Sequence, residues 1–219
     1  MNLYIIVEGA SGEKKVYPAW ISCINKDLIE VHDLGDIVEN NYIIFSGNGY
    51  PHYYQMIDAG IEDINNYNII DYLIIAVDAE EASVDDVIKE IVEYVGNRLP
   101  PNKLKIIVQN PCLETWALGN RVVYRRHPED STLRKYLAAY DVRVNDPEKI
   151  PHYPEEGLNR AQFSFKYLKK ILNDRYRNLT YTKGNPEVIM HPTYFRQIVL
   201  RYEEYDHIGS FASFINTFK

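Results

Sequence analysis

The chain has 219 residues, of which 46% are hydrophobic and 13% aromatic, a composition that favours a folded core and excludes an intrinsically disordered protein. Every apolar run falls short of the roughly 20 residues that cross a bilayer, and no basic residues precede the first one, so we expect a cytoplasmic protein with no membrane partner. The two cysteines, Cys23 and Cys112, form no CxxC motif and are too few for a disulfide framework.

Charge divides the chain into two unlike regions. Residues 1–119 carry 7 Lys or Arg against 19 Asp or Glu, and residues 120–219 carry 17 against 12. The acidic region is typical either of solvated helix faces or of a cation site, and the mildly basic region either of ordinary surface or of a polyanion platform. The sequence therefore predicts an α/β domain at 1–119 and a helical, mildly basic region at 120–219 that packs on it.

Strands and helices alternate through the first region. Short apolar runs predict strands, and apolar residues spaced by three and four predict helices between them. The predicted strands are Leu3–Val7, Tyr42–Phe45, Asp71–Val77 and Leu104–Val108, and the predicted helices are Glu13–Asn25, His52–Asn65 and Val84–Arg98. Pro18 lies inside the first helix, which therefore either begins near Tyr17 or bends at the proline. This order predicts an α/β fold, an open parallel sheet flanked by helices on both faces.

Carboxylates stand where two of these strands end. Glu8 follows the first strand directly, and Asp78 and Glu80 follow the third. Because ligand sites of such sheets lie beyond the carboxyl ends of the strands, we expect these acids at one edge. In an extended segment Asp78 and Glu80 share a face. Carboxylates gathered in this way repel one another unless a cation neutralises them, and hard oxygen ligands suit Mg²⁺ or Mn²⁺.

The glycine-rich turns match no nucleotide-binding motif. The segment Gly9–Lys14 is not a P-loop, because the motif requires glycine where Lys14 stands. The Gly47-Asn48-Gly49 turn lacks the third glycine of a dinucleotide fingerprint, and the chain has no GxSxG elbow. These absences disfavour nucleotide-dependent and serine-hydrolase functions.

Three motifs, taken together, resemble a known family. Val7-Glu8-Gly9 after one strand and Asp78-x-Glu80 after another resemble the Toprim domain of topoisomerases, primases, OLD-family nucleases and recombination proteins. The segment QNPCLETWAL at 109–118 is similar to the NPCFExWLL segment of RloB-like proteins, a Toprim-related family found near bacterial restriction and defence loci. The resemblance covers about residues 3–118. Glu80 departs from the usual Asp-x-Asp pair by one methylene group.

The resemblance implies a Toprim-like sheet and a Mg²⁺-dependent phosphodiesterase, a nuclease acting on DNA or RNA in bacterial or archaeal phage defence or in repair. Matched residue by residue, it implies that Glu8 is the general acid or base and that Asp78 and Glu80 bind Mg²⁺ or Mn²⁺. We expect Glu8 and Glu114, the glutamate of the NPCxE segment, as further metal ligands. A separately encoded ATPase or restriction-system protein is an expected partner. The alternative is a non-catalytic Toprim-fold module that binds nucleic acid or a partner protein.

Cations for a nucleic-acid partner come from the second region. Its predicted helices are Leu133–Tyr140, Ala161–Arg177 and Tyr194–Tyr205. The candidate nucleic-acid-binding residues are Arg121, Arg125, Arg126, Lys166, Lys169, Lys170, Arg175 and Arg177. Tyrosines interleave with several of these cations, a pattern that suits phosphates held by cations and bases stacked on rings, and equally amphipathic helices with buried rings. His191, which precedes a proline, is a phosphate or metal contact in one interpretation and structural in the other.

Each candidate acid also has a structural interpretation. Glu8 is then a turn or helix-cap carboxylate, Asp78 and Glu80 lie in a solvated loop, and Glu114 forms an ion pair with an arginine of the second region, such as Arg121 or Arg125. The active-site hypothesis instead requires Glu8 and the Asp78/Glu80 pair to lie within about 6–8 Å of each other, the reach of one hydrated divalent ion.

Overall fold

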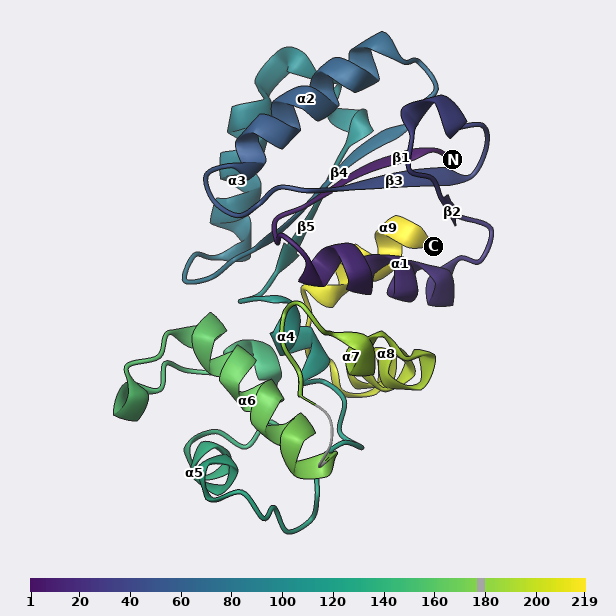
Figure 1. The fold of residues 1–219 in the computed structure, drawn as a ribbon. Helices are drawn as coiled ribbons and strands as arrows, with labels where there is room; N and C mark the ends of the chain where they lie inside the picture. Colours follow the sequence, from purple (N-terminus) through teal and green to yellow (C-terminus); the bar gives the residue numbers. More distant parts are fainter. Residues whose placement is uncertain (177–179) are drawn as a thin grey trace. The chain divides into compact units, whose positions relative to one another are not determined.

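Five strands form a single parallel sheet in the computed structural model, which describes residues 1–176 and 180–219 (Figure 1). The strands are β1 (Leu3–Val7), β2 (Ile29–Glu30), β3 (Asn41–Ser46), β4 (Tyr72–Asp78) and β5 (Leu104–Gln109). Their order across the sheet is β2-β3-β1-β4-β5, so β1 lies at the centre between β3 and β4. The predicted parallel α/β fold is therefore confirmed.

Helices make up most of the remaining regular structure. In the described residues the α-helices are α1 (Gly12–Ile24), α2 (Tyr53–Asn66), α3 (Val84–Val95), α4 (Leu113–Ala117), α5 (Ser131–Ala139), α6 (Arg160–Arg175), α7 (Glu187–Met190), α8 (Pro192–Tyr205) and α9 (Phe211–Phe218). Pro18 lies inside α1, which begins at Gly12 rather than near Tyr17. No helix of the described residues is long and apolar enough to span a bilayer.

The chain divides into two compact units. The first comprises Met1–Val77, Val84–Val108 and Ser213–Lys219, and the second comprises Asp78–Ser83 and Gln109–Ala212. The sequence placed the boundary after residue 119, whereas residues 109–119 lie in the second unit because α4 packs on α6. The end of the chain joins the first unit because the Phe214 ring packs edge-on against the rings of Tyr17 and Trp20 in α1.

The core of the first unit surrounds β1. All five residues of β1 are buried, as expected for a central strand covered on both faces. Figure 1 shows α2 and α3 on one face of the sheet and α1 with the end of α9 on the other. The central position of β1 places its carboxyl end between the ends of β3 and β4.

Packed aromatic rings form much of the core of the second unit. The ring of Tyr136 in α5 contacts the rings of Tyr153, Phe163 and Tyr167, with centroids 5.1–5.5 Å apart. The α6 helix begins at a capping box in which the Asn159 side chain accepts from the backbone of Gln162. Tyr167 is fully buried, so the tyrosine of the Lys166–Lys170 stretch belongs to the core, as the amphipathic interpretation predicted.

Candidate active site at the strand ends

The main chain at Glu8 is held from both sides. The Glu8 N–H donates to the carbonyl of Ala76 in β4 at 2.9 Å, and the Glu8 carbonyl accepts from the N–H of Gly49 at 2.8 Å. One residue further along the chain, the Ser46 hydroxyl donates to the Gly9 carbonyl at 2.8 Å. These bonds fix the backbone from which the half-buried Glu8 side chain extends. The carboxylate thus sits on a rigid backbone at the end of the central strand.

A buried side chain packs so closely against Gly9 that it leaves no room for a β-carbon there. A β-carbon added at Gly9 would overlap the carboxylate of Glu13, because that carboxylate lies directly against the glycine. Glu13 belongs to the first turn of α1 and is only 6% exposed. Glu13 could not be identified from the sequence, because an acid in the first turn of a helix is common and does not by itself indicate a functional site. A second carboxylate, that of Glu13, therefore packs against the Val7-Glu8-Gly9 turn.

Tyr53 is a further neighbour of Glu8 in the first unit. Burial is the main reason that the pKa of the Tyr53 phenol is raised, and the negative charges of Glu90 and Glu8 add to it. Tyr53 lies at the start of α2, and an added β-carbon at Gly47 would meet it, so the turn after β3 packs closely against this residue. Tyr53 is thus close enough to Glu8 to feel its charge, and nothing in the sequence indicated this neighbour.

Asp78 and Glu80 adopt different conformations at the end of β4. Asp78 is the last residue of the strand and is half-buried, whereas Glu80 is exposed and has a φ of 51°, in the left-handed region. The N–H of Glu80 donates to the Pro111 carbonyl at 2.9 Å. The segment is therefore not extended at Glu80, and the strand alternation that placed the two carboxylates on one face was wrong. A non-glycine residue in this region is strained and is found disproportionately at functional sites.

Glu114 lies in a buried polar cluster within the second unit. It is 2% exposed and accepts a hydrogen bond from the Tyr181 hydroxyl at 3.1 Å. The thiol of Cys112 is also buried, and its pKa is raised by that burial and by the nearby charges of Glu114 and Asp78. The structure therefore brings Asp78 and Glu114 together around Cys112. The partner that holds Glu114 is a tyrosine rather than an arginine.

Several of the cations predicted to bind nucleic acid form ion pairs with carboxylates. Arg125 pairs with Glu129 at 2.6 Å and lies 3.8 Å from Asp174. Two of the α6 lysines are also paired: Lys166 with Glu156 at 3.0 Å and Lys170 with Asp130 at 2.9 Å. Because their charge is locally neutralised, these three cations are poorer phosphate contacts than the sequence suggested.

Other predicted cations are less engaged. The Arg121 guanidinium lies over the Tyr205 ring, 4.4 Å from its centroid. For Arg126, Lys169 and Arg175, no ion pair is found within residues 1–176 and 180–219. Arg177 lies outside the described residues. The structure therefore separates the candidate cations into structural and accessible sets.

The candidate metal ligands have the right chemistry but no ready-made cluster. Across the described parts of the chain, no group of three or more His, Cys, Asp or Glu side chains is arranged to hold a metal ion. The expected donors are all carboxylates, which suit Mg²⁺ or Mn²⁺. Glu8 belongs to the first unit, and Asp78, Glu80 and Glu114 belong to the second. The expected separation of about 6–8 Å between Glu8 and the Asp78/Glu80 pair stays a prediction.

Comparisons with protein families, with curated proteins and with solved structures each found no match to this chain. The Toprim resemblance therefore remains a hypothesis that rests on the three motifs.

Proposed function

We propose that the chain is a Mg²⁺-dependent Toprim-type phosphodiesterase, a nuclease acting on DNA or RNA in a defence or repair setting. The observation that carries the proposal is the adjacency of β1 and β4. These parallel neighbours pair in register from Leu3 with Tyr72 to Val7 with Ala76, so their carboxyl ends share an edge. Glu8 follows one strand and Asp78 ends the other. Ligands of open parallel sheets bind beyond the carboxyl ends of the strands, which is where both acids stand along the chain.

The proposal assigns a role to each acid. Asp78, Glu80 and Glu114 would hold the cation, with Glu8 as a further candidate ligand. A divalent cation bound there supplies Lewis-acid chemistry, which polarises a phosphoryl oxygen and lowers the pKa of a bound water. Glu8 is suited to exchange a proton with an attacking or leaving oxygen, because its backbone is held on both sides. Tyr181 is a positioning residue that orients Glu114.

A cleavage assay tests the proposal. Single- and double-stranded DNA and RNA are incubated with the protein in Mg²⁺ or Mn²⁺, and in EDTA. We expect metal-dependent cleavage that Glu8→Gln and Asp78→Asn each lower by about 10²- to 10⁴-fold. The matched controls are Glu39→Gln and Asp85→Asn, which remove the same charges at exposed positions. Both controls should cleave at the wild-type rate.

The non-catalytic alternative predicts a different outcome of the same assay. A Toprim-fold binding module would retain nucleic acid in a gel-shift experiment but leave every substrate intact with either metal. Cleavage that persists in EDTA, or that Glu8→Gln and Asp78→Asn lower no more than their controls, would contradict the proposed mechanism. We expect a separately encoded ATPase or restriction-system protein to be the partner that supplies target specificity.

A further inference from the structure

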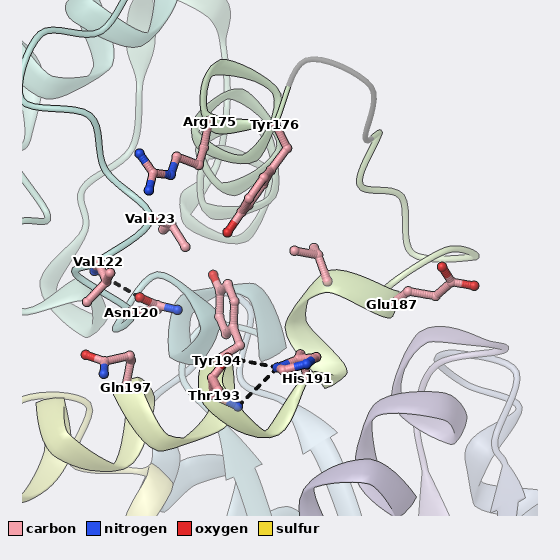
Figure 2. Close-up of a pocket in the computed structure, with 11 residues that line it drawn as sticks. Asn120, Val122, Val123, Arg175, Tyr176, Glu187, His191, Thr193, Tyr194 and Gln197 are labelled. Carbon is pink, nitrogen blue, oxygen red and sulfur yellow. Dashed lines mark hydrogen bonds between the residues drawn. The ribbon is translucent and has the colours of Figure 1, made fainter.

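A cavity of about 520 Å³ opens in the second unit where the end of α6 approaches α7 and the start of α8 (Figure 2). This volume lies in the range of roughly 300–1,000 Å³ that is typical of small-ligand sites. Its lining includes one carboxylate, Glu187, and the polar or aromatic side chains of Asn120, Arg175, Tyr176, His191, Tyr194 and Gln197. None of these is among the proposed catalytic residues.

Asn120 directs a hydrogen-bond donor into this cavity. The residue is only 3% exposed, and its Oδ1 accepts from the N–H of Val122 at 2.9 Å. That bond fixes the amide orientation and leaves the Nδ2 group as the part available to a ligand. In the described part of the chain no acceptor is found for Nδ2. A buried amide held in this way favours a ligand that offers an acceptor, such as the edge of a nucleobase.

His191 adds a second directed donor. Its Nδ1 accepts from the N–H of Thr193 at 3.3 Å at the first turn of α8. Nδ1 also lies 2.8 Å from the Thr193 hydroxyl; in the tautomer in which Nδ1 accepts both bonds, Nε2 carries the ring proton and can donate it to an oxygen of a ligand. The positive end of the α8 dipole lies at the same place, which favours an anionic group.

Tyr176 and Arg175 supply a ring and a cation at the same cavity. Tyr176 is 39% exposed, so a face of its ring is available for stacking. Tyr194, in contrast, is buried and fixed by a 2.9 Å hydrogen bond from its hydroxyl to the Ala117 carbonyl. Figure 2 shows the two tyrosines extending toward each other, while the Arg175 side chain extends away from the Tyr176 ring. A flat ring and an arginine that line the same cavity suit a base and its phosphate.

A second cavity of about 330 Å³ shares the lining residues Val122 and Gln197 with the first and is also lined by the carboxylate of Glu204. It contains Arg121, which stacks on the Tyr205 ring. The two cavities thus repeat the same combination of an arginine and a tyrosine. This repeat matches a chain of nucleotides better than a single isolated ligand.

We propose that these two cavities form a groove for single-stranded nucleic acid. One unstacked base lies against Tyr176 with its phosphate near Arg175 and His191, and the next nucleotide lies near Arg121. Paired bases in a duplex are already stacked on both faces and do not fit such a groove. The inference deepens the proposed function and rests on it, because it names single strands as the substrate class. A free nucleotide shares the same chemistry and is a separate arm of the test.

The test measures binding in catalytically silenced full-length Glu8→Gln protein. Fluorescence anisotropy follows labelled oligo(dT) and oligo(U) of about 12 nucleotides, and a duplex of the same length, across a salt series. We expect the single strands to bind at least about tenfold more tightly than the duplex. Tyr176→Ala and Arg175→Ala should each raise Kd about tenfold, and Arg175→Ala should lower the salt slope by about 0.7.

Matched controls separate the groove from general loss of rings or charge. Tyr67→Ala removes an exposed tyrosine of the first unit, and Arg196→Ala removes an exposed arginine of α8 that lines neither cavity. Both should leave Kd within about twofold of the parent protein. Thermal unfolding of each variant confirms that it folds.

Three outcomes would overturn the inference. The first is equal affinity for duplex and single strand, and the second is equal Kd for the groove variants and their controls. The third is displacement of the oligonucleotide by AMP at equal nucleotide concentration, which would assign the groove to free nucleotides. If wild-type protein still cleaves in any of these cases, the proposed function survives. Absence of both cleavage and binding would overturn both proposals.

Discussion

At the scale of single residues, the turn after β1 shows why this stretch has the sequence it has. Glu8 is positioned by main-chain bonds to β4 and to the turn that follows β3, and Gly9 leaves room for a carboxylate from the next helix. Glu13 is only 6% exposed, so it has little freedom to move aside. The glycine that follows Glu8 therefore reflects close packing rather than a demand for unusual backbone angles.

A substitution at Gly9 tests this packing. We expect Gly9→Ala to destabilise the protein by about 1–3 kcal/mol, because the new methyl group would overlap the buried carboxylate of Glu13. The control is Gly209→Ala, since no atom lies within 4 Å of an added β-carbon there. Urea unfolding measures both variants. Removing the carboxylate with Glu13→Ala in the Gly9→Ala background should recover part of the loss, and strictly additive effects would refute the proposed contact.

At the scale of elements, the loop after α5 is organised by two arginines. Arg143 holds Asp141 with a pair of hydrogen bonds of 2.9 and 2.8 Å. Arg201 of α8 is 1% exposed and donates to the carbonyls of Val142, Arg143 and Asn145, at 2.7–3.1 Å. Burial and the neighbouring charge of Arg121 lower the pKa of the Arg201 guanidinium. Main-chain carbonyls therefore hold this buried cation and tie α8 to the loop.

The Asp141–Arg143 pair makes stability depend on pH. Hydrogen bonds from Arg143 are the main reason that the pKa of Asp141 is lowered below its ordinary value of 3.8. A lowered carboxyl pKa stabilises the fold above pH 3.8, and the contribution is lost as pH falls through the lower folded value. Asp141→Asn should therefore cost about 1 kcal/mol near neutral pH and progressively less in acid, measured by urea unfolding. Asp85→Asn, at an exposed position, is the control; an equal cost at all pH values would contradict the argument.

Sequence patterns predicted the longer elements well and the short ones poorly. Buried strands such as β1 and β4 are continuous apolar runs, so their positions could be read directly. The missed elements include β2, with two residues, α7, with four, and α4, whose five residues are all buried and so show no helical period. The α9 helix was also missed. Its last residues belong to the first unit, whose other residues lie much earlier in the sequence.

The candidate site was predictable only where the backbone determines it. Glu8 and Asp78 could be placed because they stand at strand ends. The contact of Tyr181 with Glu114 joins residues 67 positions apart, and no local pattern reports such a pairing. The left-handed backbone of Glu80 was likewise invisible, since glutamate carries no preference for that conformation. Tertiary contacts, not local propensity, decide these features.

At the scale of the whole molecule, the acidic charge of residues 1–119 opposes the nucleic-acid binding that the proposed function requires. Residues 1–119 carry 19 acidic against 7 basic side chains, and such a field repels a polyanion. The basic side chains of residues 120–219 reduce that repulsion only in part, because Arg125, Lys166 and Lys170 are already paired with carboxylates. A divalent cation bound among the acids would both relieve their mutual repulsion and lower the barrier to nucleic-acid approach.

Cation binding should therefore be visible as stability, independently of catalysis. A ligand that binds only the folded state at 100 times its Kd stabilises it by about 2.7 kcal/mol, which for a chain of this length raises Tm by roughly 5–10 °C. We expect Mn²⁺ to raise the Tm of the wild-type protein by that amount and to leave Asp78→Asn nearly unchanged, measured by differential scanning calorimetry with an EDTA baseline. Asp85→Asn is the matched control, because it removes an exposed carboxylate at the start of α3 and should respond like the wild type. An equal Mn²⁺ response in Asp78→Asn would contradict the proposed cation site, since Asp78 would then contribute nothing to the binding.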